Sequence, residues 1–194
     1  MKRLLQKLFV FLLPFLLIYP ILEYRLSQLP SSYAQRKKDF ESQLTDIEIL
    51  STGSSLGNAI NPIYFNQQGF NLNNDAQDLY YDVQLVEKYL DKLPKLKIII
   101  MPISYFSMGY RIGNSLSASR QPFYTLIWGI PPQYHSELNI RYFSFIAAYG
   151  WKKVRNFLLT GDIDMIMIDQ PKKINKNGWG DYGNRSIQEN YENE

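Results

Sequence analysis

The sequence contains no cysteine and a single histidine, His135. The absence of cysteine excludes disulfide bonds, thiolate catalysis and cysteine-ligated metal sites. With one imidazole in the chain, we expect no zinc site of the usual kind, and no motif indicates a cofactor. The net charge is small, since the chain has 21 Lys and Arg against 18 Asp and Glu. The basic residues also form no long stripe along the sequence. We therefore expect no nucleic-acid partner.

The composition indicates a folded chain. Hydrophobic residues make up 45% and aromatic residues 15% of the 194 positions, which is too apolar for a disordered protein. This length suits one domain of ordinary size together with a membrane tether.

The N-terminal region carries a long apolar run. Residues 8–22 are uncharged, and the extended segment 4–22 is close to the length that spans a bilayer. The basic residues that precede this run are Lys2, Arg3 and Lys7. Only Glu23 and Arg25 follow it closely, so the positive charge lies mainly on the N-terminal side. This charge asymmetry predicts a single-pass anchor over residues 1–22, with a cytoplasmic N-terminus and the rest of the chain on the extracytoplasmic side. The lipid bilayer is then a partner through residues 4–22.

Two other interpretations of this run remain open. A cleaved signal peptide is the stronger one, although no small-x-small cleavage site lies directly after Leu22. A buried core helix would leave the basic flank unexplained.

The middle of the chain predicts an α/β domain. Short strands are expected over 47–50, 69–72 and 97–101, the last of them buried on both faces. A helix with Asp75 as its N-cap, ending before Pro94, is expected between the second and third strands. Its apolar face is expected to comprise Leu79, Val83, Val86, Leu90 and Leu93. A strand, helix and strand in this order imply a right-handed parallel crossover and a parallel sheet.

The remaining segments complete the expected organisation. Residues 23–45 read as a polar stalk, residues 46–170 as a partial domain, and residues 171–194 as a polar loop or frayed tail. A second amphipathic helix is expected over 140–158, ending before Gly161, whereas periodicity leaves 163–168 open between strand and helix. Since the sequence predicts only three strands, we expect the C-terminal part of the domain to be missing.

A serine turn follows the first predicted strand. Ser55 stands just past the strand end, where ligands bind in open parallel sheets, and Gly53 permits the sharp turn. Backbone N–H groups after such a turn can stabilise the oxyanion that forms when a serine attacks an acyl carbonyl. The turn is therefore a candidate site for acyl chemistry.

The residues around this turn carry a family resemblance. The sequence Gly-Ser-Ser-Leu at 53–56 is similar to the Gly-Asp-Ser-Leu block of the SGNH hydrolase superfamily, with Ser54 in place of Asp. Residues 59–62, 71–72 and 77–82 also resemble the membrane-anchored cell-envelope members. The resemblance covers roughly residues 47–110.

The resemblance implies a flavodoxin-like three-layer α/β/α domain with Ser55 as the nucleophile. It further implies an esterase or O-acyltransferase that acts on acyl esters of a cell-envelope glycan or lipid. Ser55, Ala76 and Ser104 become oxyanion-hole candidates, with Ala76 at the family's glycine position and Ser104 at its asparagine position. Asn73 and Asn74 are substrate-binding candidates, although asparagine near a helix start is often a cap.

The chain lacks the family's Asp-x-x-His block, which supplies the base. His135 is preceded three residues earlier by Pro132 and receives no role. Without a base a serine hydroxyl is a weak nucleophile, so we expect the isolated chain to be inactive. The alternatives are a non-catalytic anchored scaffold or binding protein, and a protein in which only the anchor and stalk function.

Overall fold

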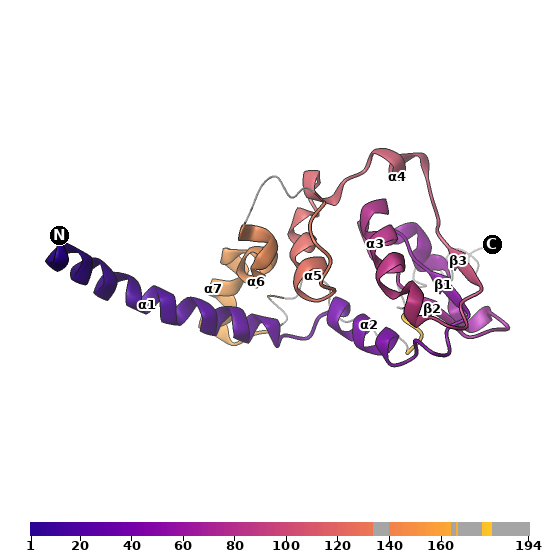
Figure 1. Ribbon diagram of the computed structural model, residues 1–194, viewed down its shortest axis with the longest axis horizontal. Coiled ribbons are helices and arrows are strands. Elements are labelled where there is room, and N and C mark those ends of the chain that lie inside the picture. The colour runs from indigo at the N-terminus through magenta and orange to yellow at the C-terminus, as the bar shows by residue number, and fades with distance from the viewer. Residues whose placement is uncertain (134–139, 164–165, 167–175, 180–194) are drawn as a thin grey trace, which may run out of the picture.

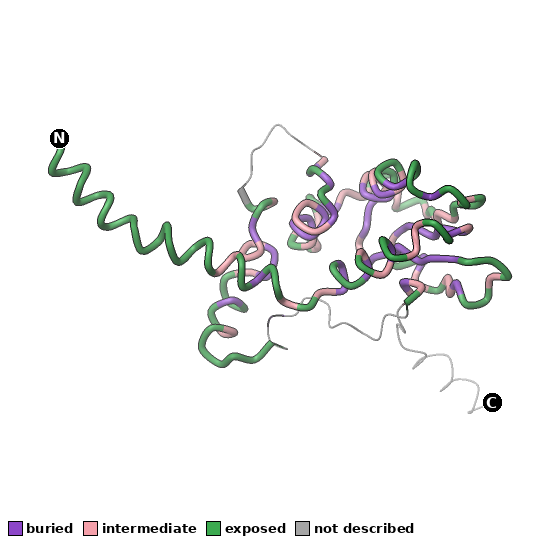
Figure 2. The backbone as a smooth tube through the Cα atoms, turned by 60° about the horizontal axis from the view of Figure 1, so that its bottom comes forward, coloured by how far each residue is buried: buried purple, intermediate pink, exposed green. Residues whose placement is uncertain are grey.

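The computed structural model describes residues 1–133, 140–163, 166 and 176–179 (Figure 1). It consists of a long N-terminal helix that leads into a region of short helices and a small sheet. Figure 2 shows that the buried residues gather away from the N-terminal helix, around the sheet and the helices beside it.

Helix α1 (Lys2–Ser27) projects from the rest of the molecule (Figures 1 and 2). Every residue from Met1 to Ile21 is exposed, and burial begins at Leu22. The helix is long and apolar enough to cross a membrane, which supports the expected membrane anchor.

Three short strands form a parallel sheet in the described residues. Strand β1 (Ile49–Ser51) is central and pairs with β2 (Gly69–Asn71) on one side and with β3 (Ile98–Ile100) on the other. The 3₁₀ helices η1 (Ser55–Ala59) and η2 (Pro62–Tyr64) connect β1 to β2. Helix α3 (Leu79–Tyr89), with the turn η3 (Leu90–Lys92), connects β2 to β3. The expected α/β architecture with a parallel sheet is confirmed.

Strand β3 corrects one expectation. Ile98 and Ile99 remain 48% and 40% exposed, so this strand is not buried on both faces. Both β2 and β3 are edge strands of the described sheet, but β2 is buried because Phe40 of α2 and residue 177 contact it.

Helix α3 begins later than expected. Asp78, not Asp75, is the N-cap, and its Oδ1 accepts a hydrogen bond from the Tyr81 amide at 3.2 Å. The buried positions of the helix are Tyr81, Asp82, Leu85 and Tyr89. Two members of the predicted apolar face, Val83 and Leu90, are exposed instead. Large tyrosine rings at helical spacing therefore decide which side of the helix meets the core.

Residues 23–45, expected to be a stalk, pack into the core. Helix α2 (Ser32–Glu41) begins at Ser31, whose hydroxyl accepts a hydrogen bond from the Ala34 amide. Its Phe40 ring lies 5.1 Å from that of Phe70 in β2 and 5.0 Å from that of Tyr89 in α3. The segment is therefore part of the folded core and not a free spacer. Its few buried side chains could not be recognised in the sequence because the segment is mostly polar.

An aromatic-rich region follows β3. It holds α4 (Tyr105–Gly109), η4 (Ile112–Asn114), η5 (Ala118–Arg120) and α5 (Gln121–Leu126). The ring of Tyr124 in α5 stacks on that of Tyr81 with centroids 4.1 Å apart. This contact ties α5 to α3 in one core.

The helix expected over 140–158 is divided into three. The elements are η6 (Ile140–Phe143), α6 (Phe145–Tyr149) and α7 (Trp151–Thr160). Gly150 separates α6 from α7 with φ +81°, a conformation that interrupts a right-handed helix. Gly161 ends α7 with φ +71°, as expected. The segment 163–168 lies outside the described residues except for exposed Ile163 and buried Ile166.

Residues 176–179 pack against the sheet. The Asn177 carbonyl accepts a hydrogen bond from the Asn71 amide at 2.9 Å, and the Trp179 indole N–H donates to the Asn58 carbonyl at 2.9 Å. These residues form a turn that packs on the sheet. The remainder of 171–194 lies outside the described residues.

Candidate active site

The carboxyl ends of the three parallel strands meet at one edge of the sheet. Ser55 follows β1, Ala76 follows β2 and Ser104 follows β3, and all three line one cavity of about 510 Å³. The other residues that line the cavity are Ser54, Leu56, Gln77, Asp78, Leu79, Asp82, Pro102, Tyr105, Phe106, Ser107 and Tyr110. The structure therefore brings the predicted nucleophile and both further oxyanion candidates to one place, where parallel sheets bind ligands.

Ser55 is the first residue of η1. Ser54 precedes it as the N-cap, and the Ser54 carbonyl accepts a hydrogen bond from the Gly57 amide at 2.9 Å. Ser55 is exposed, and within the described part of the chain its hydroxyl has no hydrogen-bond partner. The hydroxyl is thus free to meet a ligand.

Close packing beneath the turn holds η1 in position. A Cβ atom added to Gly57 would lie 2.0 Å from Oδ1 of Asn73, so only glycine fits there. The Asn73 side chain also donates to the Gly57 carbonyl at 3.0 Å and to the Ser51 hydroxyl at 2.8 Å. Asn73 therefore fixes the turn against the end of β1.

Ala76 has an unusual backbone. Its φ of +59° is the one positive value at a non-glycine among the described residues. This left-handed conformation costs an L-residue about 1–2 kcal/mol, which glycine would not incur. Ala76 stands where the SGNH resemblance expects a glycine. Its amide donates no hydrogen bond within the described residues, which leaves it available at the cavity.

Ser104 differs from the other two candidates because its amide is already used. Ser104 is the N-cap of α4, and its N–H donates to the Ser107 hydroxyl at 3.1 Å. The two hydroxyl oxygens lie 3.3 Å apart. Any contribution of Ser104 to ligand binding therefore comes from its hydroxyl.

The substrate-binding candidates Asn73 and Asn74 do not line the cavity. Both are buried, and Asn74 donates to Oε1 of Gln77 at 3.3 Å while it accepts from Arg36. In this structure they support the loop that carries Ala76 rather than present groups to a ligand.

A buried carboxyl group, missed in the sequence, lies at the cavity. Oδ1 of Asp82 accepts hydrogen bonds from the Thr52 hydroxyl at 2.9 Å and from the Gln77 amide at 2.5 Å. Burial raises the pKa of Asp82 to about 6, and the negative charge of Asp78 acts in the same direction, against the two hydrogen bonds. An aspartate within a helix of mostly apolar residues is the signal that could have identified it.

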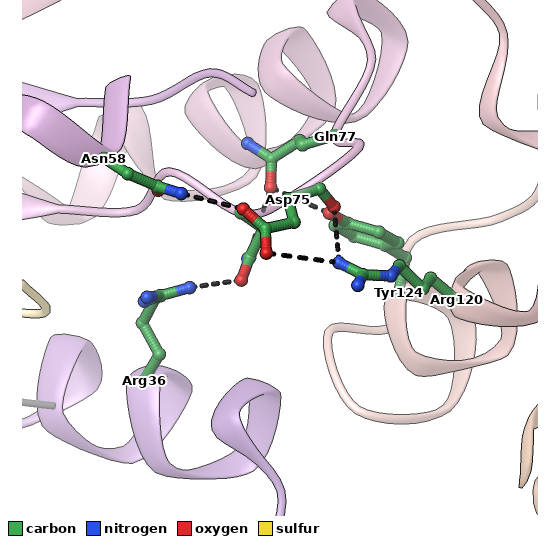
Figure 3. A network of polar contacts seen from close by, with 7 residues as sticks. Arg36, Asn58, Asp75, Gln77, Arg120 and Tyr124 are labelled. Carbon is green, nitrogen blue, oxygen red and sulfur yellow. Dashed lines mark hydrogen bonds and ion pairs between the residues drawn. The ribbon is translucent and has the colours of Figure 1, made fainter. Parts of the chain in front are cut away.

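Gln77, which donates to this carboxyl, belongs to a network that holds the loop between β2 and α3 (Figure 3). Oε1 of Gln77 accepts a hydrogen bond from the Tyr124 hydroxyl at 2.9 Å. Arg36 of α2 donates to Asn74 and, at 3.2 Å, to the Gly178 carbonyl. Figure 3 shows the loop held between Arg36 on one side and Arg120 on the other.

Asp75 is the anchor point for Arg120 in this network. The Asp75 carboxylate accepts a hydrogen bond from Asn58 at 2.8 Å and pairs with Arg120 at 4.0 Å. The Arg120 guanidinium also donates to the Asp75 carbonyl at 2.9 Å. The network fixes the backbone on both sides of Ala76, which keeps its strained conformation in place.

Among the described residues, no hydrogen bond joins the Ser55 hydroxyl to a base. Of the two carboxylates that line the cavity, Asp78 accepts from the amides of Tyr81 and Ile112, and Asp82 accepts from Thr52 and Gln77 through Oδ1. His135 lies outside the described residues. The described residues also contain no cluster of three or more side chains able to hold a metal ion.

Comparison of the chain with protein-family models, with curated proteins and with solved structures found no match.

Proposed function

We propose that the chain is a membrane-anchored, SGNH-like serine esterase or O-acyltransferase that acts on acyl esters of a cell-envelope glycan or lipid. One observation carries the proposal. An exposed serine with a free hydroxyl, Ser55, and a left-handed residue with a free amide, Ala76, line the same cavity at the carboxyl edge of a parallel sheet.

The proposed reaction has two steps. Oγ of Ser55 attacks the acyl carbonyl carbon, loses its proton to a base, and forms a tetrahedral intermediate whose oxyanion accepts hydrogen bonds from the amides of Ser55 and Ala76. The alkoxide of the glycan or lipid leaves with a proton, and the acyl group remains on Ser55. Water or a sugar hydroxyl then removes it.

The base in this scheme comes from outside the described residues, because neither Asp78 nor Asp82 is hydrogen-bonded to Ser55 and both accept from other groups. The isolated chain is accordingly expected to turn over substrate poorly. Preorganised oxyanion donors alone still give catalysis of roughly 10³–10⁴ over water in serine hydrolases, so reactivity toward a strong electrophile remains measurable.

The finer fold assignment is part of the same proposal. The strand order β2-β1-β3 with all pairs parallel is how a flavodoxin-like sheet begins. We also propose that the N-terminus of α1 is cytoplasmic and that the cavity faces the extracytoplasmic side, on the strength of the basic residues before the apolar run.

A non-catalytic anchored binding protein is the second candidate. The observation that favours it is that, among the described residues, neither cavity carboxylate is hydrogen-bonded to the Ser55 hydroxyl, while both accept from other groups. Such a protein would keep the cavity to bind an acyl ester without cleaving it.

A fluorophosphonate probe tests the two candidates on the full chain in detergent micelles. The proposal expects slow, covalent labelling at Ser55, located by mass spectrometry of the peptide. Ser55→Ala should abolish it, while Ser119→Ala, at an exposed serine of η5 outside the cavity, is the control that retains it. Absence of labelling in a folded sample would favour the binding protein, and labelling at another serine would contradict both assignments.

A further inference from the structure

Helix α7 presents apolar side chains to the outside. Trp151, Leu158 and Leu159 are 60%, 51% and 77% exposed, although all belong to a ten-residue helix with Val154 buried on its inner side. Positions 151, 158 and 159 fall on one face of a helix of 3.6 residues per turn, with Arg155 between them. An apolar strip of this kind indicates a surface that another apolar phase covers.

The same helix is strongly basic. Lys152, Lys153 and Arg155 are exposed, and residues 151–160 contain no acidic side chain. Lys152 borders the apolar strip and Arg155 lies within it. A helix with Trp and Leu on one face and Lys and Arg beside them is typical of elements that lie in the headgroup region of a bilayer.

Polar contacts fix this part of the chain to α1. The Glu23 carboxylate accepts hydrogen bonds from the Ser144 hydroxyl at 2.6 Å and from the Phe145 amide at 2.7 Å, at the start of α6. A carboxylate there also complements the helix dipole. Helix α6 continues through Gly150 into α7, and Figures 1 and 2 both show α7 beside the C-terminal part of α1.

The position of Glu23 along α1 locates this contact relative to the bilayer. Residues of α1 are exposed as far as Ile21 and become partly buried from Leu22, where Glu23 follows. If the exposed apolar part of α1 lies in lipid, the bilayer surface falls near this boundary. Glu23 therefore places α6 and α7 at the level of the headgroups.

We propose that α7 rests on the anionic surface of the membrane that α1 spans. Trp151, Leu158 and Leu159 enter the boundary between headgroups and acyl chains, and Lys152 and Arg155 bind lipid phosphates. The contact holds the cavity at a fixed distance from the bilayer. This inference rests on α1 being a membrane span and is independent of any reaction at Ser55.

Depth measurement with a spin label tests the proposal. Because the chain has no cysteine, a single introduced cysteine carries the label specifically. We would compare Leu159→Cys with Ile63→Cys in the full chain, reconstituted in nanodiscs with and without phosphatidylglycerol. Ile63 is a matched aliphatic control, 69% exposed in η2, which contacts β2.

In anionic nanodiscs the label at Leu159 should collide more with dissolved oxygen than with a water-soluble nickel chelate, and the label at Ile63 should show the reverse. Lys152→Gln and Arg155→Gln should each reduce the ratio of membrane-bound to water-exposed α7 about fivefold. Replacement of anionic by neutral lipid should act in the same direction.

Two outcomes would overturn the proposal. One is equal, aqueous exposure of the labels at Leu159 and Ile63 in anionic nanodiscs. The other is dipolar broadening of the Leu159 spectrum that disappears when labelled chains are diluted with unlabelled chains, since a second copy of the chain would then cover the face. Labelling of Ser55 by fluorophosphonate is a separate readout, so failure here leaves the proposed chemistry unaffected.

Discussion

The Thr52 hydroxyl donates a hydrogen bond to Oδ1 of Asp82 across 2.9 Å. This contact joins the end of the central strand β1 to the buried side of helix α3, directly behind the serine turn. It places a carboxyl group of raised pKa at the cavity, and the oxygen that accepts from Thr52 also accepts from Gln77.

The first prediction concerns stability against pH. Burial raises the pKa of Asp82 to about 6, above the value of about 3.9 in an unfolded chain. Between these values the unfolded chain ionises while the folded protein keeps its proton, so the contribution of Asp82 is fully present below pH 4 and is lost as pH rises through 6. The loss is about 3 kcal/mol of unfolding free energy.

The variant Asp82→Asn tests this pH dependence, because its side chain keeps an acceptor for Thr52 but carries no ionisable group. The difference in unfolding free energy between variant and wild type should grow in favour of the variant by about 3 kcal/mol from pH 4 to pH 7. Urea unfolding of the full chain in micelles, followed by circular dichroism, measures it. A difference that stays constant with pH would contradict the raised pKa.

The second prediction concerns the left-handed residue. Ala76→Gly should leave the fold unchanged and raise the unfolding free energy by up to about 1 kcal/mol, because relief of the φ +59° conformation outweighs the added entropy of the unfolded chain. Ala76→Val should lower it by about 1–2 kcal/mol, since a β-branched side chain fits this region poorly. Chemical unfolding measures both. Equal effects of glycine and valine would show that backbone strain is not what matters at this position.

The third prediction compares two glycines. A Cβ at Gly57 would meet the Asn73 side chain at 2.0 Å, whereas a Cβ at Gly109 meets nothing within 4 Å. Gly57→Ala should therefore cost about 1–3 kcal/mol and slow the labelling of Ser55, which shares helix η1 with Gly57. Gly109→Ala at the end of α4 should be neutral within about 0.5 kcal/mol. Unfolding free energy and labelling rate are measured together, and a neutral Gly57→Ala would contradict the close contact.

The fourth prediction concerns the buried arginine of α2. Arg36→Lys keeps the charge but cannot donate from two nitrogens in a fixed plane to both Asn74 and Gly178. The expected loss is about 2–3 kcal/mol, as buried acceptors lose a charged partner. Because Gly178 precedes Trp179, the tryptophan emission should also shift to the red.

The control for this variant is Lys38→Arg, an exposed position on the same helix, which should change the unfolding free energy by less than about 0.5 kcal/mol. The red shift should vanish in a Trp179→Phe background. If it persists there, another tryptophan reports the change and the contact between α2 and residues 176–179 is not what Arg36 supports.

Local patterns in the sequence were enough to locate the strands. The apolar runs before Ser51, around Phe70 and at 98–100 are short, and a helical period lies between the second and the third. A strand, helix and strand in that order predict parallel pairing, which the sheet shows. The serine turn at Ser55 and its place at the carboxyl edge of the sheet follow in the same way. The exposed apolar helix α1 is equally a property of composition alone.

The predictions that failed depend on contacts distant in sequence. Residues 23–45 look polar, yet Phe40 becomes core because Phe70 and Tyr89 meet it from two other elements. The two edge strands differ in burial because α2 and residue 177 contact β2, and the apolar face of α3 depends on which tyrosines find ring partners.

The chain's own sequence thus determined a membrane-length helix, a parallel sheet and a serine at the strand end, because each arises from local periodicity and turn chemistry. Tertiary structure alone decided that Asp82 is buried against Thr52, that Asn73 and Asn74 support a loop instead of facing the cavity, and that Ala76 turns left-handed beside Ser55. The physical reason is that burial and hydrogen-bond partners are set by residues tens of positions apart, which no local pattern specifies.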